Sequence, residues 1–175
     1  MNRFLVAGRG VALGLACIAA QAASLDVPAP LRAAEHESLV GTLAARGVQI
    51  YECRVSATGA QWAFVAPDAD LFDADGRVAG RHGAGPIWEA ADGSRVVGTV
   101  KARADAPAAG AVPWLLLATR AAGPQGRFSA VTSIQRVNTA GGLAPSAPCT
   151  VETQGATARV DYTADYRLFA SENRQ

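Results

Sequence analysis

Turn-forming residues recur along this chain at intervals of about 8–12 residues, and this rhythm constrains its fold more than any other feature. The segments between the turns are short and rich in β-branched and aromatic residues, and several alternate between apolar and polar positions. Such a pattern is typical of antiparallel strands. We therefore expect an all-β domain, either a single antiparallel β-sandwich or a flattened β-barrel. The expected strands cover residues 37–45, 48–55, 61–66, 87–91, 95–102, 112–120, 128–137 and 158–169.

Local residue choices predict where these strands end. Arg46-Gly47 is expected to form the turn of a hairpin, and the alternative is a helix over residues 32–45, because alanine, leucine and glutamate favour helices. Pro67 is expected to stop the strand that precedes it. Asp73-Ala74-Asp75-Gly76 has the signature of a turn, and Asp92-Gly93 is a hairpin turn of the Asp-Gly type. Residues 138–148 are a loop by composition.

The core is expected to include one very apolar segment. Residues 112–120 (VPWLLLATR) form an apolar run, which is typical of a strand buried on both faces. Trp114, Leu116 and Ile134 are therefore expected to be buried.

The first 22 residues have the pattern of a secretory signal peptide. Arg3 and Arg9 are basic, Val11–Ala20 is an uncharged apolar run, and Ala20-Gln21-Ala22 is an A-x-A cleavage site. The run is too short to cross a bilayer, which takes about 20 apolar residues. The alternative is a lipoprotein signal at Cys17. We expect an exported chain, periplasmic or extracellular, with no transmembrane segment after cleavage.

The rest of the chain reads as one domain. The whole chain has 175 residues, of which 50% are hydrophobic and 18% charged, and this is enough for one packed core. Residues 23–34 are expected to be an extended lead-in, followed by a single all-β domain over residues 35–175. The formal net charge is +1, and it turns slightly negative once the signal is removed. This balance predicts no nucleic-acid partner.

Two cysteines, Cys53 and Cys149, remain after the signal peptide is removed. In an oxidising compartment we expect them to be paired, and a loop of this length stabilises by about 4–5 kcal/mol in the chain-entropy model. The alternative is two unrelated buried thiols. Two cysteines so far apart and two histidines do not suggest a metal site, and no cofactor is expected.

Six segments of the chain are similar to a known family. They resemble the domain of unknown function 3455 family, whose members are exported proteins of bacteria and fungi. The resemblance implies export and a single domain, and the two cysteines lie where that family's cysteines lie. It implies no activity, ligand or catalytic residue. The segments are GVQIYEC (47–53), APDADLFDADG (66–76), HGAGPIWEAADGSRVVG (82–98), VPWLLLA (112–118), VTSIQRVNTAGGLAP (131–145) and YTADYRLF (162–169).

The segment from His82 to Glu89 is the first candidate site. His82, Trp88 and Glu89 combine a titratable ring, a flat apolar face and a carboxylate, next to glycines that permit close backbone approach. The alternative is a tight turn in which Trp88 fills the core and His82 serves only the local structure.

A second candidate lies at Arg136 and Asn138, beside a pair of glycines. A guanidinium offers forked donors to an anion or a hydroxyl, although such residues often only satisfy loop backbone. No familiar catalytic motif is present: there is no G-x-S-x-G elbow, no Walker loop and no H-E-x-x-H.

Three functional hypotheses follow, of which the first is preferred. The chain is expected to be a binding or envelope-associated protein whose partner is a small molecule or an envelope component. The first alternative is a small hydrolase-like enzyme that uses His82 and a carboxylate. The second alternative is a structural or stress-protection protein with no small ligand.

Overall fold

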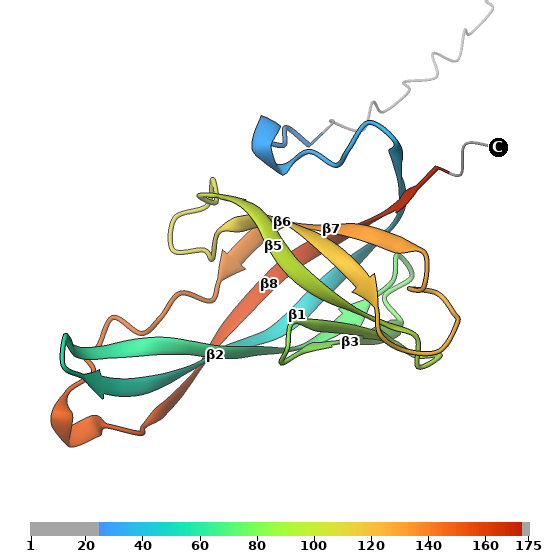
Figure 1. Cartoon of the computed structure of the whole chain (residues 1–175). Coiled ribbons are helices and arrows are strands. Elements are labelled where there is room, and N and C mark those ends of the chain that lie inside the picture. The colour runs from blue at the N-terminus through green and yellow to red at the C-terminus, as the bar shows by residue number, and fades with distance from the viewer. Residues whose placement is uncertain (1–24, 173–175) are drawn as a thin grey trace, which may run out of the picture.

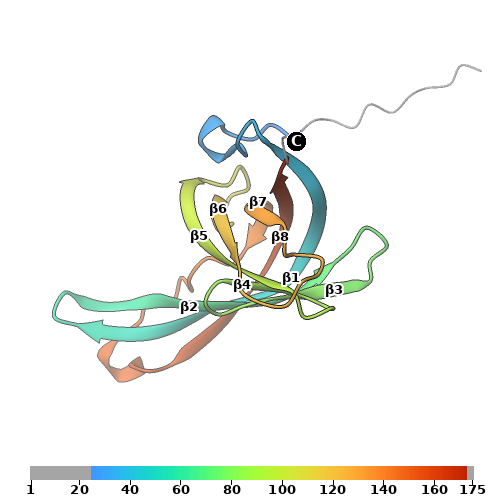
Figure 2. The same ribbon diagram turned by 45° about the vertical axis from the view of Figure 1, so that its right-hand side comes forward.

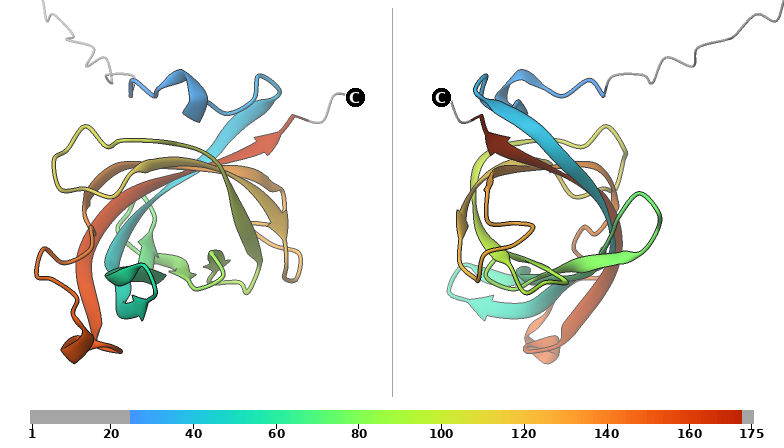
Figure 3. Two further views of the ribbon diagram at one scale, coloured as in Figure 1. Left: turned by 60° about the vertical axis from the view of Figure 1, so that its left-hand side comes forward. Right: turned by 90° about the vertical axis from the view of Figure 1, so that its right-hand side faces the viewer.

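Eight antiparallel strands form a closed barrel in the computed structural model, which describes residues 25–172 (Figure 1). Each strand pairs with the next along the chain, and β8 pairs with β1, so that the ring is seen end-on in Figure 3. The all-β prediction is confirmed, whereas the predicted signal peptide lies outside the described residues. The strands are β1 (Glu37–Ser56), β2 (Gly59–Phe72), β3 (Val78–Gly83), β4 (Ile87–Ala90), β5 (Arg95–Ala104), β6 (Trp114–Ala121), β7 (Val131–Gly141) and β8 (Thr157–Ser171), with two 3-10 helices, η1 (Ala29–Leu31) and η2 (Val151–Thr153).

The predicted hairpin at Arg46-Gly47 is wrong, and so is its helical alternative, because one long strand covers this region. β1 runs without interruption through Arg46 and Gly47, and Gly47 pairs with Ala69 on one side and Tyr162 on the other. A Cβ atom at Gly47 would lie 2.2 Å from the backbone oxygen of Asp68. Gly47 is therefore needed because β2 approaches closely here, and it does not mark a turn.

The predicted strand end at Pro67 is also wrong, because β2 continues through Pro67 to Phe72. Pro67 pairs with Gln49 of β1, but β2 begins to pair with β3 only at Ala69. One side of the strand at Pro67 therefore has no partner strand, and a proline is accepted at such an edge.

The predicted turns at the two Asp-Gly sites are present. Asp73 accepts hydrogen bonds from the backbone amides of Asp75 and Arg77, and Gly76 has a φ of 76°. Asp92-Gly93 joins β4 to β5. β7 begins only at Val131 and extends to Gly141, past the predicted strand end, because a register shift after Val137 lets the pairing with β8 continue.

A loop between β6 and β7 packs against the β4–β5 turn. The hydroxyl of Ser94 donates to Asp92 (2.6 Å) and accepts from the backbone amide of Phe128 (3.0 Å). The amide of Arg127 donates to the other oxygen of Asp92. These hydrogen bonds lower the pKa of Asp92 to about 2, and the bond from the Ser94 hydroxyl has the largest effect. They fix the fully buried Phe128 in the core.

The lead-in covers the outside of the barrel over β5 and β6, above which it lies in Figure 1. Val27 and Leu31 pack there against Trp114 and Val137. This second layer explains the apolar run of β6, because Trp114 faces the lead-in while Leu117 belongs to the core inside. The predicted burial is confirmed for Trp114 and Ile134, whereas Leu116 is only partly buried beneath the lead-in.

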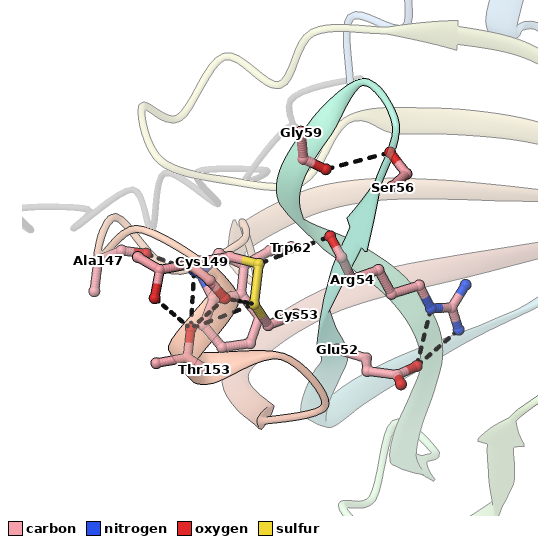
Figure 4. The surroundings of a disulfide bond; sticks show 10 residues. Glu52, Cys53, Arg54, Ser56, Gly59, Trp62, Ala147, Cys149 and Thr153 are labelled. Atoms are coloured by element: carbon pink, nitrogen blue, oxygen red, sulfur yellow. Dashed lines mark hydrogen bonds and ion pairs between the residues drawn. A yellow bond between two sulfur atoms is a disulfide. The ribbon is translucent and has the colours of Figure 1, made fainter.

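The β1–β2 turn and the loop that carries η2 project together beyond the ring (Figure 2). The predicted disulfide is present between Cys53 of β1 and Cys149, 96 positions apart. The indole of Trp62 donates to the Ala147 carbonyl oxygen at 2.8 Å beside it (Figure 4). The disulfide therefore ties the projecting end of β1 to the segment before η2. Over residues 25–172, no helix is both long and apolar enough to cross a membrane.

Candidate ligand site in the barrel interior

A cavity of about 180 Å³ extends from the buried core to the surface of the barrel. At its deep side lie buried aromatic residues, and at its mouth lie Phe64, Val65 and Val100, each about half exposed. A wider depression of about 350 Å³ adjoins it. Gln49, Phe64, Val100, Leu115 and Arg136 line both spaces. The other residues around the cavity are Val65, Pro67, His82, Gly85, Pro86, Trp88, Leu117 and Tyr166.

Three aromatic rings form the deep wall of the cavity. His82 of β3 pairs directly with Trp88 of β4, so their side chains leave the sheet on the same face. The two rings stack with centroids 4.1 Å apart and 15° between their planes. Tyr166 of β8 meets both rings edge-on, at 5.0 Å and 5.4 Å. This wall is flat, rigid and largely apolar.

His82 is held neutral by this environment. Burial, together with the smaller effect of the positive charge of Arg136, lowers its pKa to about 3, against the opposing effect of a hydrogen bond to Ile87. Nδ1 lies 2.9 Å from the Ile87 carbonyl oxygen, which can only accept, so Nδ1 carries the proton. Nε2 is then an acceptor, and no residue of the described chain donates to it.

Arg136 places a positive charge beside the aromatic wall. Its cross-strand neighbours are Leu115 of β6 and Tyr166 of β8, which line the same cavity. Nε and Nη2 donate to the Pro113 carbonyl oxygen at 3.1 Å and 2.8 Å. Within residues 25–172 the guanidinium makes no ion pair, and no acidic side chain lines the cavity or the depression.

Two further donors in the cavity wall lack partners. Gln49 and Trp88 are almost fully buried, yet within the described part of the chain neither Gln49 Nε2 nor Trp88 Nε1 has a hydrogen-bond acceptor. By contrast, the nearby Tyr51 hydroxyl donates to the Gly142 carbonyl oxygen at 2.6 Å. Burial raises the pKa of Tyr166, so its phenol stays protonated at neutral pH.

The structure brings together three of the five predicted site residues: His82, Trp88 and Arg136 line one cavity. Glu89 follows Trp88 in β4 and so lies on the outer face, where its half-exposed carboxylate is 3.7 Å from Arg95. Asn138 is also exposed, and its amide donates to Asp165 at 2.7 Å.

Gln49 and Tyr166 were not among the predicted site residues. A signal was available for Gln49, because strand alternation places it on the face of Tyr51 and Cys53. Tyr166 needed the register of β7 and β8, which pairs it with Arg136. In the described ranges, no three histidine, cysteine, aspartate or glutamate side chains are grouped as a metal site requires.

Comparison with known families identifies the chain. A family model described as "Protein of unknown function (DUF3455)" matches residues 33–170, which cover all eight strands apart from the last residue of β8. Comparisons with curated proteins and with solved structures give no significant match. The match spans most of the sequence and agrees with the motifs noted above. The chain belongs to the DUF3455 family, a family of unknown function.

Proposed function

We propose that this chain is a binding protein that holds a small molecule inside its barrel, in the cavity beside His82, Trp88 and Arg136. One observation carries the proposal: a cavity lined by buried aromatic rings and by the Arg136 guanidinium reaches the surface, and no acidic side chain of residues 25–172 lines it. Ligand pockets are typically apolar and concave, with a few polar groups that orient the ligand. A small molecule with an apolar body and a group that Arg136 can bind fits this lining.

The size of the cavity supports a small ligand. An apolar cavity of about 150 Å³ is sufficient for benzene. The cavity here measures about 180 Å³, so it accepts one ring with a substituent. A longer molecule would extend past Arg136 into the adjoining depression.

The mouth of the cavity supports the same proposal. Phe64 of β2 and Val100 of β5 are 52% and 51% exposed, and both line the opening. An exposed apolar rim around a pocket attracts the apolar part of a ligand out of water. Together with the buried rings, it favours a ligand with an apolar body.

The hydrolase-like alternative has less support from the cavity. The residues that line the cavity include His82 but no carboxylate, and Glu89 lies on the outer face of the barrel. The lowered pKa of His82, about 3, also makes it a weak base at neutral pH. We further propose that the protein acts outside the cytoplasm, since a disulfide such as Cys53–Cys149 persists in oxidising compartments.

Toluene is a suitable first probe, because it is neutral and small enough for the cavity. Saturation-transfer NMR should detect toluene bound to the wild-type protein. Val100→Trp should abolish the signal, because an indole at the mouth would fill the entrance. Val78→Trp is the matched control, since Val78 is 58% exposed on β3 and does not line this cavity. It should bind toluene as the wild type does.

Two results would contradict the proposal. One is the absence of toluene binding to a folded wild-type protein. The other is equal toluene binding by the wild type and Val100→Trp, which would place the probe elsewhere on the surface. Either result would favour the alternative of a structural protein with no small ligand.

A further inference from the structure

We propose that the ligand is a small planar organic anion, of which an aromatic monocarboxylate is the simplest form. This inference rests on the proposed function and specifies the chemistry of the same cavity. Its ring would lie against His82, Trp88 and Tyr166, and its carboxylate would bind Arg136. The argument has three steps: the charge of the lining, the geometry of the donors and the shape of the deep wall.

The charge of the lining is one-sided. Arg136 lines the cavity and the depression, Arg103 lines the depression, and no acidic side chain of the described chain lines either. The whole sequence has nearly equal numbers of basic and acidic residues, 16 and 15. The excess of positive charge is therefore local to this site, and it favours an anion over a neutral or cationic ligand.

The guanidinium of Arg136 is held in place before any ligand arrives. Its Nε and Nη2 both donate to the Pro113 carbonyl oxygen, which fixes its plane, and its side chain also interacts with Tyr166 in the same wall. A carboxylate pairs with a guanidinium through charge-assisted hydrogen bonds, which are stronger than neutral ones.

The deep wall favours a flat ring over a flexible chain. The stacked pair of His82 and Trp88 presents aromatic surface, and Tyr166 stands nearly perpendicular to it, at 66° and 77° to the two rings. Aromatic rings prefer such stacked and edge-on neighbours. The volume of about 180 Å³ admits a single ring with its carboxylate directed to Arg136.

Benzoate and benzamide provide the test, because they share size and shape and differ in charge. Isothermal titration calorimetry of the wild-type protein should show benzoate binding about tenfold tighter than benzamide, as a hydrogen bond to a charged group implies. Arg136→Gln should reduce benzoate affinity by about tenfold and bring the two ligands close to parity. Arg120→Gln is the matched control, since Arg120 is exposed on the neighbouring strand β6, and it should leave both affinities unchanged.

The outcomes separate this inference from the proposed function. Toluene binding together with equal affinities for benzoate and benzamide would overturn the anionic ligand and retain a small-molecule site. Loss of all three probes would overturn both. The wild-type comparison needs no variant, so it decides the question even if Arg136→Gln fails to fold. Unchanged benzoate affinity in a folded Arg136→Gln protein would also overturn the inference.

Discussion

The barrel interior has two parts with different chemistry. One part is filled by apolar side chains with no measurable exposure, such as Leu43, Leu71 and Phe128. The other part surrounds the cavity and contains His82 and Arg136 on the same barrel-facing sides of their strands. The difference teaches that one core combines a tightly packed apolar part with a part that leaves space beside polar groups. Burial of the apolar part stabilises the fold and so offsets the cost of buried polar groups without partners in the other part.

The largest effect is expected from the apolar part. Phe128→Ala should lower the free energy of unfolding by about 3–5 kcal/mol, because it leaves a cavity at a fully buried position. Phe64→Ala at the cavity mouth removes the same side chain from a site that is 52% exposed, and should cost about 1 kcal/mol or less. Urea denaturation measures both values. Equal losses would show that the two parts of the interior are not energetically distinct.

A smaller effect is expected from the pH dependence of the polar part. His82 has a pKa of about 3 when folded, against its ordinary value of 6.5, so below pH 6.5 the unfolded chain binds more protons. Stability is therefore lost as the pH falls from 6.5 towards 3. Between pH 7 and pH 5 the wild type should lose about 2 kcal/mol more than His82→Phe, which keeps a ring beside Trp88.

Denaturation curves at the two pH values test this expectation. His36→Gln is the control, because it removes the other histidine from an exposed position. It should retain the pH dependence of the wild type. If His82→Phe shows the same loss of stability as the wild type between pH 7 and pH 5, His82 is not held neutral by burial.

The smallest effect is expected on the outer face of the same strand. Glu89→Gln should change the free energy of unfolding by about 0.5 kcal/mol or less, because its ion pair with Arg95 is exposed to water. It should also leave toluene binding unchanged, since Glu89 does not line the cavity. A clear loss of toluene binding would place Glu89 in the site, as the sequence had suggested.

The sequence predicts most of the strands and places the interruptions between them poorly, and β3, which carries His82, was not among the expected strands. Alternation identified the all-β class, and the Asp-Gly turns were found because their chemistry is local. Gly47 and Pro67 were misread as breaks because each depends on a neighbouring strand. Gly47 is needed where β2 approaches closely, and Pro67 is accepted where β2 lacks a partner on one side. Such requirements cannot be read from one segment alone.

The candidate site was predicted in part for the same reason. His82 and Trp88 were found together because they are close in sequence and pair across one hairpin. Glu89 was grouped with them by proximity along the chain, although alternation sends its side chain outward. The placement of His82 and Arg136 around one cavity arises from closure of the ring, and no local pattern predicts it.

That closure also determines when the fold can be completed. Glu37 at the start of β1 pairs with Ser171 at the end of β8, so the first strand takes its second partner from the end of the described chain. A polypeptide that emerges from a ribosome or a membrane pore N-terminus first must hold β1 with one open edge until β8 follows. The Cys53–Cys149 bond also joins an early strand to a late segment, the one between β7 and β8. Assembly of this barrel is thus a late and non-local event, and a chain cut short before β8 would present open strand edges to its neighbours.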